Sequence, residues 1–144
     1  MEWNRSEYQV TCDPLKLDVK LVAEFLTNSY WAKGISFPTV KKALENSLCF
    51  AVFKKHRQIG FARVITDYAT FAYLGDVFIL PEFRGLGQWL IECIIAHPDL
   101  QNFRRWILAT RDAHGLYEKF GFTPLKKPES FMEKHNPEVY ARGT

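Results

Sequence analysis

Apolar and polar residues follow one another along this chain in segments that predict both helices and strands. Residues 8–11 predict a short first strand, and Asp18 can cap a helix whose apolar residues recur at helical spacing. An irregular segment at 29–38 follows, and Thr39 can cap a second, short helix. The first third of the chain therefore predicts one strand and two helices.

Three apolar runs in the middle of the chain predict strands. They cover Leu48–Phe53, Ile59–Thr66 and Thr70–Leu80, and polar turns at 55–58 and 67–68 separate them. Because these connections are short, the three strands are predicted to form an antiparallel meander.

The second half of the chain predicts a β-α-β unit. A helix at 88–97 separates the strand at 70–80 from a strand at 106–109, so these two strands should run parallel. A short helix at 113–120 and an extended stretch near Phe131 follow.

The predicted order is β-α-α-β-β-β-α-β-α-β. It describes an α/β (α+β) fold with a mixed, mostly antiparallel central sheet and helices on both faces. A chain of 144 residues suits a single domain spanning 1–144. Ligands of such sheets tend to bind where the topology switches, which here is the end of the strand at 70–80.

Composition narrows the class of protein. Apolar residues make up 47% and charged residues 24%, which excludes a disordered chain, and a net charge of +3 is too small to predict nucleic-acid binding. The start of the chain is polar, and no apolar run approaches the roughly 20 residues of a membrane span. Three widely spaced cysteines make a disulfide framework or a metal site improbable. We therefore expect a cytoplasmic protein without a metal.

A Gly-rich turn connects the strand at 70–80 to the helix at 88–97. Its residues, Pro81 to Leu90, leave backbone N–H groups free at the helix start, where the helix dipole also favours an anion. Arg84 adds a forked cation, and glycine lets the backbone approach the anion. The turn therefore predicts a site for a phosphate-bearing ligand.

Two other phosphate-binding patterns do not fit this turn. The P-loop needs Lys followed by Ser or Thr after its last glycine, and the sequence has neither there. The dinucleotide fingerprint needs a glycine at position 90, which is Leu90, and it belongs near the first strand of its unit.

Two motifs in the chain resemble the GNAT superfamily of N-acetyltransferases. Residues 84–89 resemble its acetyl-CoA pyrophosphate loop, Arg/Gln-x-x-Gly-x-Gly/Ala, with Trp89 in place of the usual Gly or Ala. Residues 113–122 resemble its Ala-x-x-x-Tyr-x-x-x-Gly-Phe segment, and Thr110 stands where Asn is common. The resemblance covers nearly the whole chain and points to a bacterial subgroup whose substrates are unassigned.

The resemblance implies that the chain binds acetyl-CoA and transfers its acetyl group to a primary amine by direct attack. In the family, backbone groups of the strand before the loop hold the pantetheine arm and orient the thioester carbonyl. The implied cofactor-binding residues comprise the end of that strand, the loop and the position of the usual Asn: Val77, Phe78, Ile79, Leu80, Arg84, Gly85, Leu86, Gly87, Gln88, Trp89 and Thr110.

Tyr117 and Asp76 are the candidate catalytic residues. Tyr117 lies in the second motif, and its ordinary pKa of about 10 suits proton donation to a departing thiolate, although a lone tyrosine on an amphipathic helix also suits the core. Asp76 interrupts an apolar strand, so its carboxylate needs a reason. It is either the base that deprotonates the amine, directly or through a water, or a hydrogen-bonding residue at a bend beside Gly75.

The resemblance also places the acceptor pocket at the segment 29–38, where Tyr30, Trp31 and Phe37 line the pocket or cover the core. An aromatic pocket with Asp76 favours a cationic or aromatic amine. The expected partner is therefore a small-molecule amine, with no nucleic acid and no membrane, and the family allows a homodimer. Two alternatives stay open: a non-catalytic acyl-CoA-binding or regulatory module, and an acetyltransferase of protein lysines or N-termini.

Overall fold

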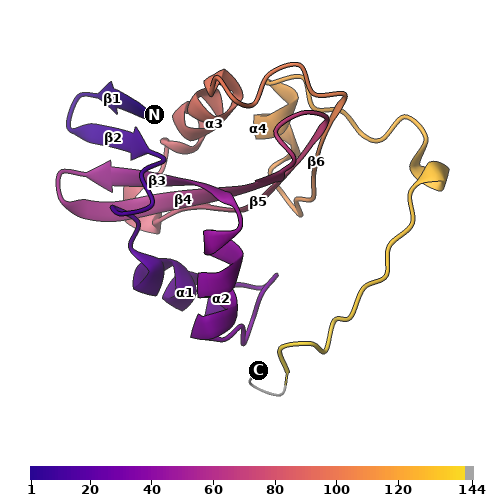
Figure 1. Cartoon of the computed structure of the whole chain (residues 1–144), viewed down its shortest axis with the longest axis horizontal. Helices are drawn as coiled ribbons and strands as arrows, with labels where there is room; N and C mark the ends of the chain where they lie inside the picture. Colours follow the sequence, from indigo (N-terminus) through magenta and orange to yellow (C-terminus); the bar gives the residue numbers. More distant parts are fainter. Residues whose placement is uncertain (142–144) are drawn as a thin grey trace.

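A mixed sheet with its strands in chain order forms the centre of this protein, as Figure 1 shows for the computed structural model, which describes residues 1–141. Neighbouring strands pair antiparallel from β1 to β5, and β6 pairs parallel with β5. The strands are β1 (Glu2–Arg5), β2 (Tyr8–Thr11), β3 (Leu48–Lys54), β4 (Arg57–Thr66), β5 (Phe71–Ile79) and β6 (Arg105–Leu108). The helices are α1 (Val19–Thr27), α2 (Phe37–Glu45), α3 (Gly87–Ala96) and α4 (His114–Glu118), with short 3-10 helices at Pro81–Phe83 and Pro128–Ser130.

The predicted meander and the predicted parallel pair are both confirmed. The turn between β3 and β4 is shorter than predicted, because Arg57 and Gln58 belong to β4. Gln58 can be buried there because its side-chain amide has hydrogen-bond partners. Its oxygen accepts from the Asp18 backbone N–H at 2.8 Å, and its nitrogen donates to the Gly60 carbonyl at 3.0 Å.

The first two helices form where the apolar spacing predicted them. Asp18 caps α1 as predicted, since its carboxylate accepts from the Leu21 N–H at 3.0 Å. The predicted Thr39 cap of α2 is wrong. Ser36 is the N-cap, its hydroxyl accepts from the Thr39 N–H at 3.4 Å, and Pro38 lies in the first turn, where no N–H is needed.

An N-terminal strand that the pattern did not predict, β1, lies at the edge of the sheet. It pairs with β2 from Glu2 opposite Thr11 to Arg5 opposite Tyr8. Most of its residues are polar and partly or fully exposed, while Trp3 packs against the core. Pairing with β2, rather than burial of an apolar face, defines this strand, so its sequence carries little signal.

The last predicted strand, near Phe131, is not found within residues 1–141. The chain there is exposed and has no partner in the sheet. Pro128 and Pro137 lack the N–H groups that a sheet ladder needs. The observed order therefore gains a strand at its start and loses one at its end.

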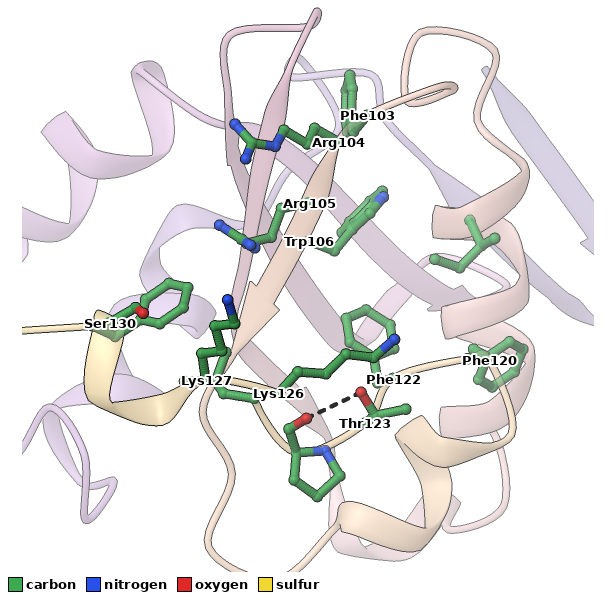
Figure 2. Close-up of a pocket in the computed structure, with 15 residues that line it drawn as sticks. Phe103, Arg104, Arg105, Trp106, Phe120, Phe122, Thr123, Lys126, Lys127 and Ser130 are labelled. Carbon is green, nitrogen blue, oxygen red and sulfur yellow. Dashed lines mark hydrogen bonds between the residues drawn. The ribbon is translucent and has the colours of Figure 1, made fainter.

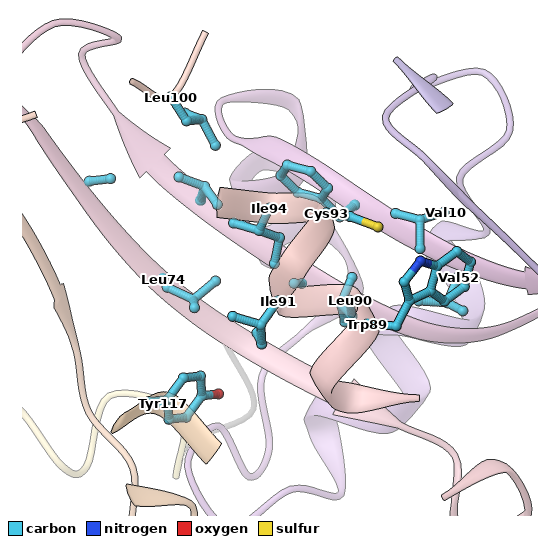
Figure 3. Close-up of a cluster of buried hydrophobic side chains, with 14 of the residues drawn as sticks. Val10, Val52, Leu74, Trp89, Leu90, Ile91, Cys93, Ile94, Leu100 and Tyr117 are labelled. Carbon is cyan, nitrogen blue, oxygen red and sulfur yellow. The ribbon is translucent and has the colours of Figure 1, made fainter. Parts of the chain in front are cut away.

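Helices cover both faces of the sheet, as predicted. The cluster that includes Val22 and Val40 packs α1 and α2 against one face, and α3 and α4 pack on the other (Figure 1). A second apolar cluster lies on the α3 side of the sheet. Figure 3 shows it, with Leu90, Ile91 and Ile94 of α3 packing toward the strands. Within the described residues, no helix is long and apolar enough to cross a bilayer.

Candidate active site

The Gly-rich turn forms a short 3-10 helix and then the start of α3. Gly85 has a φ of +97°, which residues with a side chain rarely adopt. The N-cap of α3 supplies no side-chain acceptor to the amides of its first turn. Arg84 is exposed and forms no ion pair within residues 1–141. The turn therefore presents free N–H groups, a helix dipole and a cation to an anion.

The start of α3 lies beside α4. A Cβ added at Gly87 would lie 3.8 Å from Cδ2 of Leu116. The Lys119 ammonium donates to the side-chain oxygen of Gln88 at 3.3 Å, which brings a second exposed cation to the turn. Lys119 was not predicted, because 31 positions separate it from Gln88. Its place just after Tyr117 is the one sequence signal that could have suggested it.

Trp89, which replaces the usual small residue, buries its side chain in the core. The indole is 8% exposed, and Figure 3 shows it beside Val52. The guanidinium of Arg5 lies 5.9 Å from the ring centre. Its backbone N–H still belongs to the first turn of α3, so the substitution fills the core and leaves the start of the helix accessible.

The strands β5 and β6 separate halfway along β5. Their pairing ends where Leu74 lies opposite Leu108, whereas β5 continues beyond that point. On the other side, Ala62 of β4 faces two residues of β5, so β5 bulges at Asp76, whose φ is +53°. Within residues 1–141, the edge of β5 that faces β6 is therefore unpaired after the bulge, and the predicted cofactor segment, 77–80, lies there.

A cavity of about 540 Å³ opens at this separation, and it is called the catalytic cavity below because the candidate catalytic residues line it. Its walls come from the segment before α2, the bulged part of β5, and the end of β6 with the start of α4. Six predicted site residues line it: Tyr30, Trp31, Asp76, Val77, Thr110 and Tyr117. Phe37 does not line this cavity. It is the first residue of α2, and 47% of its surface is exposed to solvent.

Tyr117 of α4 is the most buried tyrosine of the catalytic cavity, with 7% of its surface exposed. Burial raises the pKa of its phenol, and Tyr30 adds a smaller effect of the same sign. Its hydroxyl has no hydrogen-bond partner among residues 1–141. Because no fully buried side-chain oxygen there lacks a partner, this hydroxyl oxygen is accessible. Nearby, Thr110 accepts from the Ala113 N–H at 3.1 Å, which leaves its hydroxyl proton free to be donated.

Two donors hold the carboxylate of Asp76. Arg63 Nε donates to Oδ2 and Trp31 Nε1 donates to Oδ1, each at 2.8 Å. Arg63 also donates to the Ser47 hydroxyl at 3.2 Å. The side chains of the ion pair are 19% and 12% exposed, so water screens it little. This geometry ties the acceptor segment to β5 and matches the hydrogen-bonding alternative for Asp76.

Aromatic rings dominate the wall of the catalytic cavity that the segment 29–38 forms. Tyr30 and Trp31 meet edge to face with ring centres 5.1 Å apart, and Arg111 lies 3.8 Å from the centre of the Tyr30 ring. Arg111, Tyr73 and Tyr140 line the cavity and were not predicted. Tyr73 lies in an apolar strand, and the other two lie in irregular segments that no motif marks.

A larger cavity, of about 940 Å³, lies beside β6 (Figure 2). Its basic residues form two separate pairs in the sequence, and the fold brings both pairs together around aromatic side chains. They are Arg104, Arg105, Lys126 and Lys127. None of the predicted catalytic or cofactor residues lines this cavity, which is therefore distinct from the catalytic cavity.

Known proteins resemble this chain across most of its length. A model of the acetyltransferase (GNAT) domain matches residues 45–124, more than half of the chain, and this range includes both motifs. The Gibberella zeae protein FG08082, which carries an acetyltransferase name, is 32% identical over 142 residues, covering 81% of this chain and 79% of that protein.

Solved structures share the fold. XCC2953 of Xanthomonas campestris pv. campestris, described as an acetyltransferase of the GNAT family, is 50% identical, with a TM-score of 0.91 over 93% of this chain and 96% of that one. A Clostridium acetobutylicum protein crystallised with acetyl-CoA is 14% identical and has a TM-score of 0.63, over 94% of this chain and 96% of that one. The chain therefore belongs to the GNAT family of N-acetyltransferases.

Proposed function

We propose that this enzyme transfers the acetyl group of acetyl-CoA to the primary amine of a small molecule. The observation that carries the proposal is the contact between the start of α3, which is ready for an anion, and α4, which presents the Tyr117 hydroxyl to a cavity. An enzyme that holds a phosphate-bearing acyl donor and protonates its thiolate needs these two features side by side.

The residues of the turn fit the pyrophosphate of acetyl-CoA. The first-turn amides of α3 would bind its oxygens, and Arg84 and Lys119 would balance its charge. The left-handed glycine at position 85 has no neighbour within 4 Å of an added Cβ, so the approach to these amides is open.

The unpaired edge of β5 fits the pantetheine arm. Leu80 donates its N–H to Ile59 at 2.8 Å, toward β4. Because backbone groups alternate in direction along a strand, those of Ile79 face the opposite, open edge. That edge leads from the turn to the catalytic cavity, where Thr110 can donate its hydroxyl proton. When bound, acetyl-CoA supplies an acetyl group activated as a thioester.

Tyr117 is proposed as the general acid. The neutral amine nitrogen bonds to the thioester carbonyl carbon as the carbon–sulfur bond breaks, and the Tyr117 hydroxyl gives its proton to the departing sulfur. The amine loses its extra proton to water, and water restores the phenol. Because burial raises the pKa of Tyr117, the phenol keeps this proton at neutral pH.

Asp76 is proposed as a positioning residue. Both of its carboxylate oxygens already accept hydrogen bonds, one from the Arg63 guanidinium and one from the Trp31 indole, so the side chain is engaged in holding its neighbours. It acts through Trp31, which it fixes at the acceptor side of the catalytic cavity.

A small-molecule acceptor suits the size of the catalytic cavity. Its volume of about 540 Å³ lies within the range of about 300–1,000 Å³ that small-molecule sites occupy. The single domain, the cytoplasmic location, the absence of nucleic-acid and membrane partners, and the homodimer stay predictions of the sequence and its resemblance.

Isothermal titration tests the donor. We expect acetyl-CoA and free CoA to bind with micromolar affinity, NAD not to bind, and Arg84→Ala to weaken both CoA species about tenfold, or about 1.4 kcal/mol. Arg104→Ala, an exposed arginine of the larger cavity, is the matched control and should bind like the wild type. Thiol release with a panel of amines then tests transfer. If neither CoA species binds the wild type, the proposal is wrong.

A further inference from the structure

The C-terminal segment swings away from the body of the protein and returns to it. Figure 1 shows the segment after α4 reaching outward and then coming back toward α1 and α2. Residues 123–139 are exposed, whereas Tyr140 is partly buried. The segment therefore meets the body beside β6, where Arg105 lies 5.0 Å from the centre of the Phe131 ring, and again at Tyr140 near its far end.

Tyr140 lies where the segment meets the catalytic cavity. It lines this cavity and also packs against the apolar cluster of α1 and α2. A local turn presents it. The Glu138 N–H donates to the Asn136 side-chain oxygen, and the Ala141 N–H donates to the Glu138 carbonyl, each at 3.1 Å. The position of Tyr140 thus follows from local hydrogen bonds as well as from packing.

Gly34 makes room for this contact. Its φ is +87°, and a Cβ added there would lie only 2.8 Å from the backbone oxygen of Tyr140. A side chain at this position would therefore strain the loop and push the C-terminal segment away. Because Gly34 follows Tyr30 and Trp31 closely, the segment docks on the loop that carries the predicted acceptor residues.

The lining of the catalytic cavity indicates what it accepts. Four aromatic side chains accompany Tyr117 around it: Tyr30, Trp31, Tyr73 and Tyr140. Of its charged groups, Asp76 pairs with Arg63, and Arg111 lies over the Tyr30 ring. Asp112 forms no ion pair among residues 1–141. Ring contacts therefore add to any attraction of an amine to Asp112.

We propose that the C-terminal segment closes the acceptor end of the catalytic cavity and that Tyr140 selects a small aromatic amine. A wall formed by this segment leaves less room for a folded protein that presents a lysine. The assignment of this ligand as the acetyl acceptor rests on the proposed function, whereas its binding does not.

Ligand-observed NMR without acetyl-CoA tests the proposal. The probes are 2-phenylethylamine and tryptamine, with hexylamine as an amine of equal charge and no ring. The wild type should bind the aromatic probes at least tenfold more tightly than hexylamine. Tyr140→Ala should reduce this preference at least fivefold and leave the Kd of acetyl-CoA unchanged. Gly34→Ala, which displaces Tyr140 without removing its ring, should act in the same direction.

Tyr68→Ala is the matched control, since Tyr68 is a half-exposed tyrosine in the turn between β4 and β5, and it should keep the wild-type preference. Circular dichroism checks that each variant is folded. An unchanged preference in folded Tyr140→Ala, or no aromatic preference in the wild type, overturns the proposal. If the aromatic probes bind as expected but release no thiol with acetyl-CoA, the proposed acetyl transfer is wrong while the role of Tyr140 stands.

Discussion

Two ionisable side chains of the catalytic cavity have opposite surroundings. Tyr117 is buried without a charged partner, so its neutral form is favoured. Asp76 is nearly as buried, but a guanidinium and an indole N–H satisfy its charged form. Burial therefore keeps the proton on the Tyr117 phenol, while two hydrogen bonds hold the Asp76 side chain in place, which suits an acid and an anchor.

Tyr117→Phe removes only the hydroxyl, because phenylalanine keeps the ring that packs in the core cluster of α3. We expect kcat to fall about 100-fold and the Kd of acetyl-CoA to stay unchanged. In the wild type, activity should persist to a pH above about 10, because burial raises the pKa of Tyr117 above that ordinary value. Stopped-flow measurement of thiol release against pH checks both statements, and a variant that retains wild-type kcat would remove Tyr117 from the mechanism.

At the scale of elements, the bulge in β5 organises the site. It places Asp76 at a positive φ, turns its carboxylate toward Arg63 of β4, and coincides with the separation of β5 from β6. Gly75 beside it leaves room for Tyr73, since an added Cβ would lie 3.0 Å from that ring. The bulge thus anchors the segment 29–38 through Trp31 and coincides with the unpaired edge of β5.

Asp76→Ala should destabilise the protein by about 3 kcal/mol. It leaves Arg63 without its carboxylate partner in a mostly buried place and puts alanine at a left-handed φ. Asp76→Asn should cost about half as much, because asparagine tolerates this φ and still accepts from Trp31. Urea unfolding gives both values. Equal losses in the two variants would mean that the charge, which both remove, accounts for the whole effect, and that the φ and the Trp31 hydrogen bond contribute little.

At the scale of the whole molecule, packing joins segments that are distant in the sequence. His97 at the end of α3 is 6% exposed and lies with its ring centre 5.7 Å from that of Phe50 in β3 and 6.1 Å from that of Trp3 in β1. Its Nδ1 accepts from the Asp99 N–H at 3.0 Å, which requires a neutral ring nitrogen. Burial accordingly lowers the pKa of His97, against a weaker opposing effect of Asp99.

Acidification should therefore weaken the fold through His97. Below the ordinary histidine pKa of about 6.5, the unfolded chain takes up a proton that the folded state resists, so stability is lost as the pH falls through this region. His97→Gln keeps an acceptor without a titrating ring. The drop in Tm between pH 8 and pH 5.5 should be smaller in this variant than in the wild type, and an equal drop would contradict the assignment.

Much of the fold could be predicted from the sequence because its main segments carry local signals. These signals are Asp18 at the start of α1, the three apolar runs of the meander, and Pro98 after α3. Each of them acts within a few residues. The errors also have physical causes. The strand β1 exists through pairing with β2, and the stretch near Phe131 joins no strand of the sheet that residues 1–141 form.

The sequence by itself determined the meander, the Gly-rich turn before α3 and the helix of Tyr117, because backbone geometry and short-range periodicity specify them. Only the tertiary structure decided that Asp76 is held by Arg63 and Trp31, that Lys119 reaches the turn, and that Tyr140 meets Gly34 at the catalytic cavity. These contacts join residues far apart in the chain. Their positions depend on how the sheet bulges and where the C-terminal segment returns, and no local pattern of residues records either.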